Sequence, residues 1–218
     1  MLLIPTYSLS SNTSINFYSL FNTFIILSII VSVIVFGIFL ALIIKNRDTG
    51  NNSEDPADVP TINKIPEERG KARNIIISLT LSSIVLIVLI SGTFGVLDDI
   101  LNPPEENTLD IDVNAFQWGW KFTYPNGHYE IGELIIPVGQ PVVLHVVSDD
   151  VIHNIGIIEY KIKIDAIPGR TNQIWFEANE PGEFTIQCYE LCGIGHAYMK
   201  AKLIALDEAD FNEWYLNQ

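Results

Sequence analysis

Basic residues are scarce in this chain of 218 residues, which has 12 lysines and arginines against 26 aspartates and glutamates. The resulting formal net charge of −14 argues against nucleic acid as a partner. Residues 1–19 contain no lysine or arginine, so they lack the basic region with which a cleaved signal peptide begins. Charge of either sign is absent from 20–44 and from 74–97, and each run is long enough to cross about 30 Å of hydrocarbon as a helix. We therefore predict two retained transmembrane helices at about 20–44 and 74–97.

The basic residues that the chain does have are concentrated between these two runs. Six of the 12 lie there, namely Lys45, Arg47, Lys64, Arg69, Lys71 and Arg73. Because loops rich in lysine and arginine stay on the cytoplasmic side, we predict that the loop 45–73 is cytoplasmic and that both termini are extracytoplasmic. The chain then divides into a transmembrane hairpin at 1–102 and an extracytoplasmic domain at 103–218. The protein would lie in a plasma membrane or an equivalent energy-transducing membrane.

The external domain carries the whole negative charge of the chain. From Asp98 onward there are 20 acidic residues and 6 basic ones, whereas the two kinds balance in the loop 45–73. Two interpretations remain open. The charge can attract a basic partner, or it can be an adaptation to an acidic exterior, where carboxylates with a pKa near about 4 are largely neutral. The dependence of partner association on ionic strength would distinguish them.

Short segments typical of β-strands follow one another in the external domain. Leu109–Val113 alternates apolar and acidic residues, and further strands are indicated at 133–137, 141–147, 173–177, 183–187 and 200–205. Turns rich in proline and glycine separate them, and a short helix is predicted after Asp207, which is a suitable cap. This pattern indicates a Greek-key barrel or sandwich. The predicted fold class is therefore two N-terminal transmembrane α-helices followed by an all-β, cupredoxin-like Greek-key barrel domain.

Soft metal ligands are gathered in one stretch near the end of the chain. It contains both cysteines, Cys188 and Cys192, as well as His196 and Met199, the only methionine besides the first residue. Thiolate, imidazole and thioether groups favour a thiophilic metal over calcium or magnesium as the main ion. His153 is the best placed additional imidazole, because it follows an apolar run at the end of a predicted strand.

Three interpretations of these residues are open on spacing alone. Two cysteines outside the cytoplasm most often form a disulfide. A mononuclear blue-copper site would use one cysteine, two histidines and the methionine, and would leave Cys188 unexplained. A dinuclear site in which both thiolates bridge two copper ions would use every ligand.

The residues resemble the CuA centre of subunit II of haem-copper (cytochrome c type) oxidases, whose pattern is H…C-x-E-x-C-x3-H-x2-M. The pattern matches here at His153, Cys188, Glu190, Cys192, His196 and Met199. The resemblance implies two copper ions bridged by both cysteines, with one histidine on each ion and the methionine as a weak ligand to one of them. It also implies that Glu190 serves one copper through its backbone carbonyl and that its carboxylate helps to hold Mg at the subunit I interface.

The resemblance extends to an aromatic stretch, 116–124, in which the family carries Q-W-x-W. Trp118 is the first tryptophan of that motif, which in the family is the entrance for electrons, whereas Gly119 stands where a tyrosine is common. Packing in the core and an interfacial aromatic belt are the alternative explanation. Asp149 and Asp150, next to His153, are candidate docking acids by the same resemblance, and a solvated turn is their alternative.

Two segments near His153 also bear on the resemblance. Residues 163–170 are close to the family's K-x-D-A-x-P-G-R signature, which packs against subunit I. Residues 154–158 depart from the aromatic residue and proline that usually follow the histidine, which puts the local shape of this segment in question.

By this likeness the chain is expected to be subunit II of a haem-copper terminal oxidase, a proton-translocating oxidoreductase. It would take single electrons from an external donor, such as cytochrome c or a cupredoxin, and pass them to haem in subunit I. Membrane lipid and the other oxidase subunits would be its remaining partners. The alternatives are subunit II of a quinol oxidase, which normally lacks the copper ligands, and a stand-alone membrane-anchored blue-copper carrier.

Overall fold

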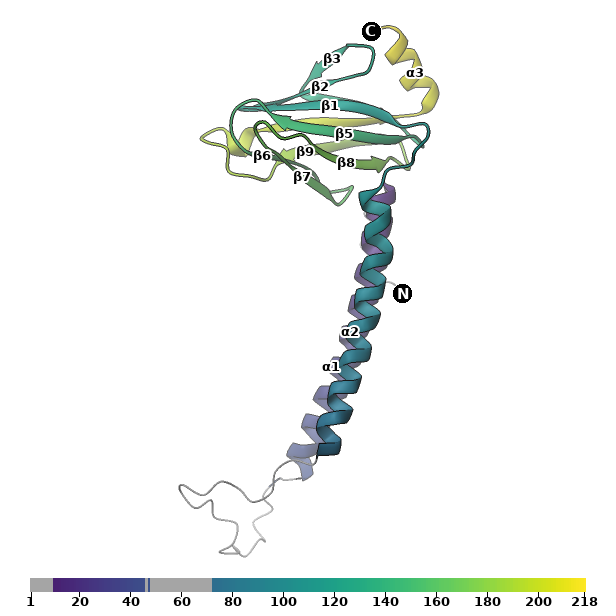
Figure 1. Cartoon of the computed structure of the whole chain (residues 1–218), viewed down its shortest axis with the longest axis vertical. Coiled ribbons are helices and arrows are strands. Elements are labelled where there is room, and N and C mark those ends of the chain that lie inside the picture. The colour runs from purple at the N-terminus through teal and green to yellow at the C-terminus, as the bar shows by residue number, and fades with distance from the viewer. Residues whose placement is uncertain (1–9, 46, 48–71) are drawn as a thin grey trace, which may run out of the picture. The chain divides into compact units, whose positions relative to one another are not determined.

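A computed structural model describes residues 10–45, 47 and 72–218 of the chain (Figure 1). These residues belong to two compact units. One unit is Phe21–Thr93, and the other combines Met1–Leu20 with Phe94–Gln218. The first unit contains the greater part of two long helices, and the second contains the β-sheets and a short C-terminal helix.

The two long helices are α1 (Asn12–Lys45) and α2 (Ala72–Leu101), and both are long and apolar enough to cross a membrane. Most of their large apolar side chains are exposed, as expected for helices whose surroundings are lipid. Both helices extend beyond the predicted bounds, 20–44 and 74–97. Those bounds marked only the charge-free runs, but backbone hydrogen bonding continues into polar residues at the ends. Most of the predicted cytoplasmic loop, 46 and 48–71, lies outside the described residues, so its orientation stays a prediction.

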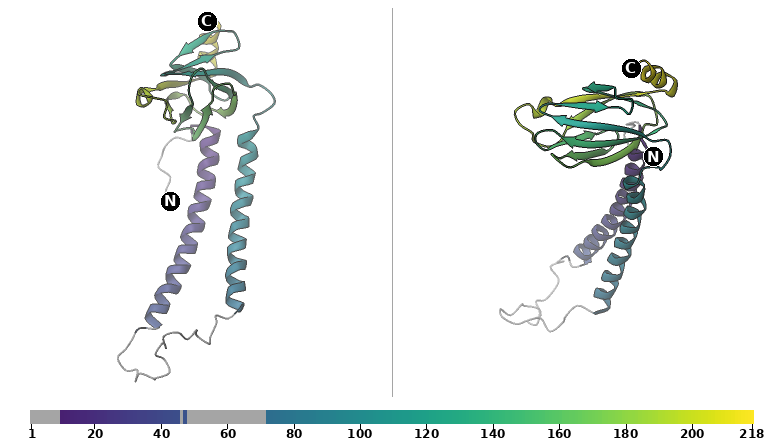
Figure 2. Two further views of the ribbon diagram at one scale, coloured as in Figure 1. Left: turned by 60° about the vertical axis from the view of Figure 1, so that its left-hand side comes forward. Right: turned by 45° about the horizontal axis from the view of Figure 1, so that its top comes forward.

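The β domain consists of two five-stranded sheets. Figure 2 shows the domain from two further sides. The first sheet has the order β3-β2-β1-β5-β8 and the second the order β4-β10-β9-β6-β7. The strands are β1 (Leu109–Phe116), β2 (Gly119–Thr123), β3 (Tyr129–Ile131), β4 (Glu133–Pro137), β5 (Pro141–Ser148), β6 (His153–Ile157), β7 (Ile162–Ala166), β8 (Asn172–Glu177), β9 (Gly182–Cys188) and β10 (Lys200–Leu206). Among them β1 pairs with β5, and β4 with β10, in parallel; the other pairs are antiparallel.

The predicted all-β domain after two apolar helices is confirmed. Predicted strands correspond to β1, β4, β5, β8, β9 and β10, and the predicted final helix is α3 (Glu208–Leu216). Asp207 occupies the N-cap position of α3 but makes no side-chain capping bond, and Phe211 is the buried contact of this helix. Four strands were not predicted, β2, β3, β6 and β7. The clearest case is β6, because all five of its residues are buried and it therefore shows no alternation of polar and apolar residues.

The core lies between the two sheets. Alternate residues of β1, from Leu109 to Ala115, point into it, while Asp110 and Asp112 between them are exposed. Trp120 and Phe122 of β2 are completely buried, as are Leu134, Phe176 and Ile186 from other strands. Cys188, Cys192 and Met199 belong to the same apolar cluster. These three sulfur-containing side chains are thus packed into the core of the domain.

Tyr124 forms a buried link between the two sheets. Its hydroxyl donates to the carbonyl of Ile135, at 2.9 Å, and accepts from the amide of the same residue, at 2.8 Å. Burial raises the pKa of Tyr124, so the hydroxyl stays protonated and can donate. The rings of Trp214 and Tyr215 each pack edge to face against Tyr124, which holds α3 against this end of the domain.

Replacing Tyr124 with phenylalanine is expected to lower the free energy of unfolding by about 1–3 kcal/mol, because both backbone groups of Ile135 would stay buried without a partner. Thermal unfolding of the full chain in detergent, followed by tryptophan fluorescence, measures the effect. Tyr215→Phe is the matched control, since that hydroxyl accepts only from the exposed amide of Asn126, at 3.2 Å. Equal stability of the two variants would contradict the prediction.

Candidate metal centre

Most of the predicted ligands lie on the connection between β9 and β10. Cys188 is the last residue of β9, and Met199 directly precedes β10. The amide of Cys188 donates to the carbonyl of Met199, at 3.1 Å, which closes the base of the loop. A short 3-10 helix, η2 (His196–Tyr198), turns His196 back toward the base. The spacing of the ligands in the sequence therefore becomes a single compact loop.

His153 reaches this loop because β6 and β9 are neighbours in one sheet. Ile155 is paired with Cys188, and the amide of Tyr189 donates to the carbonyl of Asn154, at 2.9 Å. His153 was predicted to lie on a loop at the end of a strand, but it is the first residue of β6 and is completely buried. Its Nδ1 lies 4.0 Å from the Sγ of Cys188.

The two cysteine sulfurs form the middle of the cluster. They lie 3.8 Å apart, and both cysteines are free. The Sγ of Cys192 lies 3.6 Å from the Nδ1 of His196 and 3.7 Å from the Sδ of Met199. The Sγ of Cys188 lies 3.2 Å from the backbone carbonyl oxygen of Glu190. Each sulfur thus has one imidazole and one weaker donor beside it.

The chemistry of these donors fits copper. His153, Cys188 and Cys192 present ligand atoms within 4.8 Å of one another, and all three residues are buried. Burial and the neighbouring Cys188 thiol raise the pKa of Cys192 to about 11, so copper would have to displace protons when it binds. A set of two sulfurs, two imidazoles, a thioether and a carbonyl, of which His196 is half-buried and both sulfurs are buried, suits a thiophilic ion.

Glu190 takes part in the cluster through its backbone carbonyl and not through its side chain. Its carbonyl oxygen lies beside Cys188, whereas the residue itself is exposed. Leu191, Ile194 and Tyr198 on the same loop are also exposed, at 79 %, 92 % and 86 %. The outer side of the loop is therefore an apolar surface with one acidic residue.

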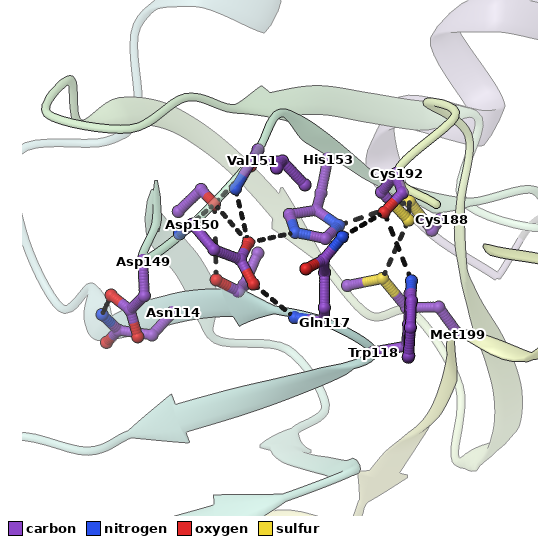
Figure 3. Close-up of polar contacts among 12 residues, drawn as sticks. Asn114, Gln117, Trp118, Asp149, Asp150, Val151, His153, Cys188, Cys192 and Met199 are labelled. Carbon is purple, nitrogen blue, oxygen red and sulfur yellow. Dashed lines mark hydrogen bonds and ion pairs between the residues drawn. The ribbon is translucent and has the colours of Figure 1, made fainter. Parts of the chain in front are cut away.

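Trp118 lies directly against the loop 188–199, which carries most of the candidate ligands and is called the metal-ligand loop below. Its Nε1 donates to the carbonyl of Cys192, at 3.3 Å, and the Nε2 of Gln117 donates to the same oxygen, at 2.7 Å (Figure 3). A Cβ at Gly195 would come within 2.3 Å of the indole, and one at Gly193 within 3.3 Å, so these glycines allow the ring to approach the loop. Trp118 remains 41 % exposed. The side chain thus connects solvent with the backbone of a candidate ligand.

Gly119 has a packing role that the sequence did not indicate. The ring of Phe116 covers it, and a Cβ at Gly119 would lie 2.8 Å from the tip of that ring. Phe116 therefore fills the space beside Gly119 that a side chain at this position would need. The Gln117–Trp118 peptide in this turn is cis.

The unusual segment after His153 is accommodated by another close contact. The ring of Tyr189 lies over Gly156, where a Cβ would be only 2.5 Å from the ring. Asn154 donates from its Nδ2 to the carboxylate of Asp165 in β7, at 2.6 Å. Asp165 belongs to the signature segment 163–170, so a side-chain hydrogen bond joins this segment to the strand that begins with His153.

The two candidate docking acids have different environments. Asp149 is exposed and accepts from the side chain of Asn114, at 2.8 Å. Asp150 accepts from the Nε2 of His153, at 2.8 Å (Figure 3). Although burial raises the pKa of Asp150, hydrogen bonds from His153, Val151 and Gln117 outweigh that effect, and the net pKa is lowered. Sequence reasoning missed this contact and the role of Gln117, although the i, i+3 spacing of Asp150 and His153 was a possible signal.

Comparisons with known proteins identify relatives of this chain by sequence. Residues 129–206 match the sequence model of the family described as cytochrome c oxidase subunit II, periplasmic domain. Cytochrome c oxidase subunit 2 of Alkalihalophilus pseudofirmus is 36% identical over 197 residues, which cover 87% of this chain and 55% of that protein. The chain thus spans about half the length of that relative.

One solved structure and a second relative extend the comparison. The crystal structure of the periplasmic domain of cytochrome oxidase subunit II from Bradyrhizobium japonicum shares 32% identity, covers 52% of this chain and 94% of that one, and gives a TM-score of 0.49. Heme-copper oxidase subunit 2 of Aeropyrum pernix is 34% identical over 211 residues, which cover 91% of this chain and 88% of the relative. On the strength of that match, the chain belongs to the subunit 2 family of haem-copper oxidases.

Proposed function

We propose that this chain is the electron-accepting subunit of a haem-copper terminal oxidase that reduces oxygen and translocates protons. It takes single electrons from an external donor, such as cytochrome c or a cupredoxin, and delivers them to haem in subunit I. The observation that carries the proposal is the pair of buried cysteine sulfurs, 3.8 Å apart, each with its own histidine. Family membership supports the oxidase assembly as the setting.

Six residues would hold a copper pair of the CuA type. Cys188 and Cys192 are the proposed bridging ligands, His153 and His196 the terminal ones, and Met199 and the Glu190 carbonyl the weak ones. Two copper ions bound there would supply a one-electron carrier whose added charge is shared by both ions. The protein contributes rigidity and exclusion of water, since Cys188, Cys192, Met199 and His153 are at most 8% exposed.

Trp118 is the proposed entrance for electrons. It is the exposed aromatic residue that contacts the carbonyl of a proposed ligand, Cys192. The apolar loop surface around Ile194 offers a donor a contact that needs no charge, while the acidic domain can attract a basic donor from a distance. The exposed carboxylate of Glu190 is the proposed contribution to a Mg site at the subunit I interface.

Two other functions make different predictions from the same residues. A quinol oxidase subunit normally lacks the ligand set that is present here. A blue-copper carrier that acts alone would hold one copper ion and would have no use for Cys188. The distance between Cys188 and His153 favours the dinuclear arrangement, because it gives the second sulfur an imidazole of its own.

Copper counting on the purified full-length chain tests the proposal. We expect two copper ions per chain and an electron paramagnetic resonance signal in which one unpaired electron is shared equally by two copper nuclei. A stoichiometry near one, with a signal from a single nucleus, would instead support the blue-copper carrier. An intramolecular cystine without bound copper in natively prepared protein would refute the electron-relay function.

A further inference from the structure

The carboxylate of Asp150 is surrounded by hydrogen-bond donors from its own domain. Its Oδ1 accepts from the Nε2 of His153 at 2.8 Å and from the amide of Val151 at 2.6 Å. Its Oδ2 accepts from the amide of Gln117 at 2.7 Å. Asp150 lies at the surface with its side chain 31% exposed, and its own domain supplies donors to both carboxylate oxygens.

This arrangement determines which nitrogen of His153 is available to a metal. A carboxylate that already accepts two backbone N–H bonds acts toward the imidazole as an acceptor, so the Nε2 of His153 carries the hydrogen. In neutral imidazole the lone pair is then on Nδ1, which is the nitrogen that faces the Sγ of Cys188. Because the ring of His153 is completely buried, this carboxylate defines the orientation and tautomer of the ring.

The second oxygen of Asp150 connects the same carboxylate to the β1–β2 turn. Gln117, whose amide binds Oδ2, donates from its side chain to the carbonyl of Cys192, and the neighbouring Trp118 donates to that oxygen too (Figure 3). One carboxylate thus joins the imidazole of His153 to the segment that carries Trp118. A side chain used in this way has little capacity left for a lysine of a docking partner.

We propose that Asp150 is a positioning residue of the metal centre, which holds His153 in the Nε2–H tautomer and fixes the Gln117–Trp118 turn against the ligand loop. This inference rests on the proposed function and assigns Asp150 a role other than docking. Asp149 keeps the docking role, because it is exposed and its carboxylate accepts from the side chain of Asn114 rather than from a candidate ligand. The two adjacent acids thus divide between an internal and an external role.

The tautomer can be measured without copper. In the metal-free full-length chain in detergent, with histidine labelled with nitrogen-15, we expect ring shifts of the Nε2–H tautomer for His153 in the wild type and in Asp149→Asn. In Asp150→Asn the preference should be lost, and Asp150→Glu should restore part of it. An Nδ1–H tautomer in the wild type would overturn the proposal even if Asp150→Asn failed to fold, as would an unchanged His153 in folded Asp150→Asn.

Copper retention gives the second readout. We expect Asp150→Asn to release copper to a competing chelator at about 10–100-fold lower chelator concentration than the wild type, which is the usual effect of losing a partner of a metal ligand. Asp149→Asn removes the same charge one residue away and should retain copper like the wild type. Equal retention in the two variants would overturn the positioning role. A wild type that bound no copper pair would refute the proposed function, whereas the ring shifts would still decide the role of Asp150.

Discussion

Replacing Cys188 with serine is expected to reduce the copper content from two ions per chain to one at most and to abolish electron transfer to subunit I. A serine hydroxyl stays protonated at neutral pH and is a poor ligand for copper, so His153 would lose the sulfur that lies beside its Nδ1. Cys192, His196 and Met199 would remain together as a mononuclear set. Elemental analysis and electron paramagnetic resonance of the purified variant measure the result, and the signal should come from a single copper nucleus.

The matched control is Met199→Leu, in which leucine replaces a weak metal donor with an apolar side chain of similar volume. Met199 is 1% exposed and contacts only one of the two sulfurs in the described cluster. We expect that variant to keep two copper ions with an altered spectrum. Serine at position 188 buries a hydroxyl at a cost of about 1–3 kcal/mol, so thermal unfolding should accompany the count. A folded Cys188→Ser protein with two copper ions would contradict the shared-sulfur arrangement.

The candidate ligands could be predicted from the sequence because four of them lie within one loop. Cys188, Cys192, His196 and Met199 need only a strand, a turn and a return strand to come together, and the connection between β9 and β10 provides this. Their residue types restrict the metal by chemistry that does not depend on the fold. Two apolar helices were predictable for a similar reason, since a charge-free run of sufficient length is a local property.

Contacts across the sheets could not be predicted in the same way. The place of His153 beside Cys188 follows from the pairing of β6 with β9, and β6 gave no periodic signal because both of its faces are buried. The contacts of the Asp150 carboxylate include the amide of Gln117, which is more than thirty positions away in the sequence. Both contacts join residues that are distant in the sequence, so no local pattern of polar and apolar residues indicates them.

Replacing Gly195 with alanine is expected to displace Trp118 from the metal-ligand loop and to slow electron uptake from a reduced donor strongly. The new Cβ would lie 2.3 Å from the Cδ2 and 2.6 Å from the Cγ of the indole, which are atoms near the root of the side chain. The ring cannot rotate away without losing its bond to the carbonyl of Cys192. Overpacking of this kind costs about 1–3 kcal/mol, and His196 directly follows the strained position. Stopped-flow oxidation of a reduced donor, normalised to bound copper, measures the effect.

Gly119→Ala separates this effect from a general effect of adding a methyl group near the site. A Cβ at Gly119 would also be too close to a ring, at 2.8 Å, but the contact is with the far tip of Phe116, which can swing aside. The backbone of Gly119 lies outside the left-handed region, so alanine is tolerated there and can reduce the entropy of the unfolded chain. We expect Gly119→Ala to stay within about 1 kcal/mol of the wild type in stability and to accept electrons at a similar rate. If both variants slowed electron uptake equally, the cause would be a general disturbance of the turn. That result would contradict the proposal that Trp118 is the entrance for electrons.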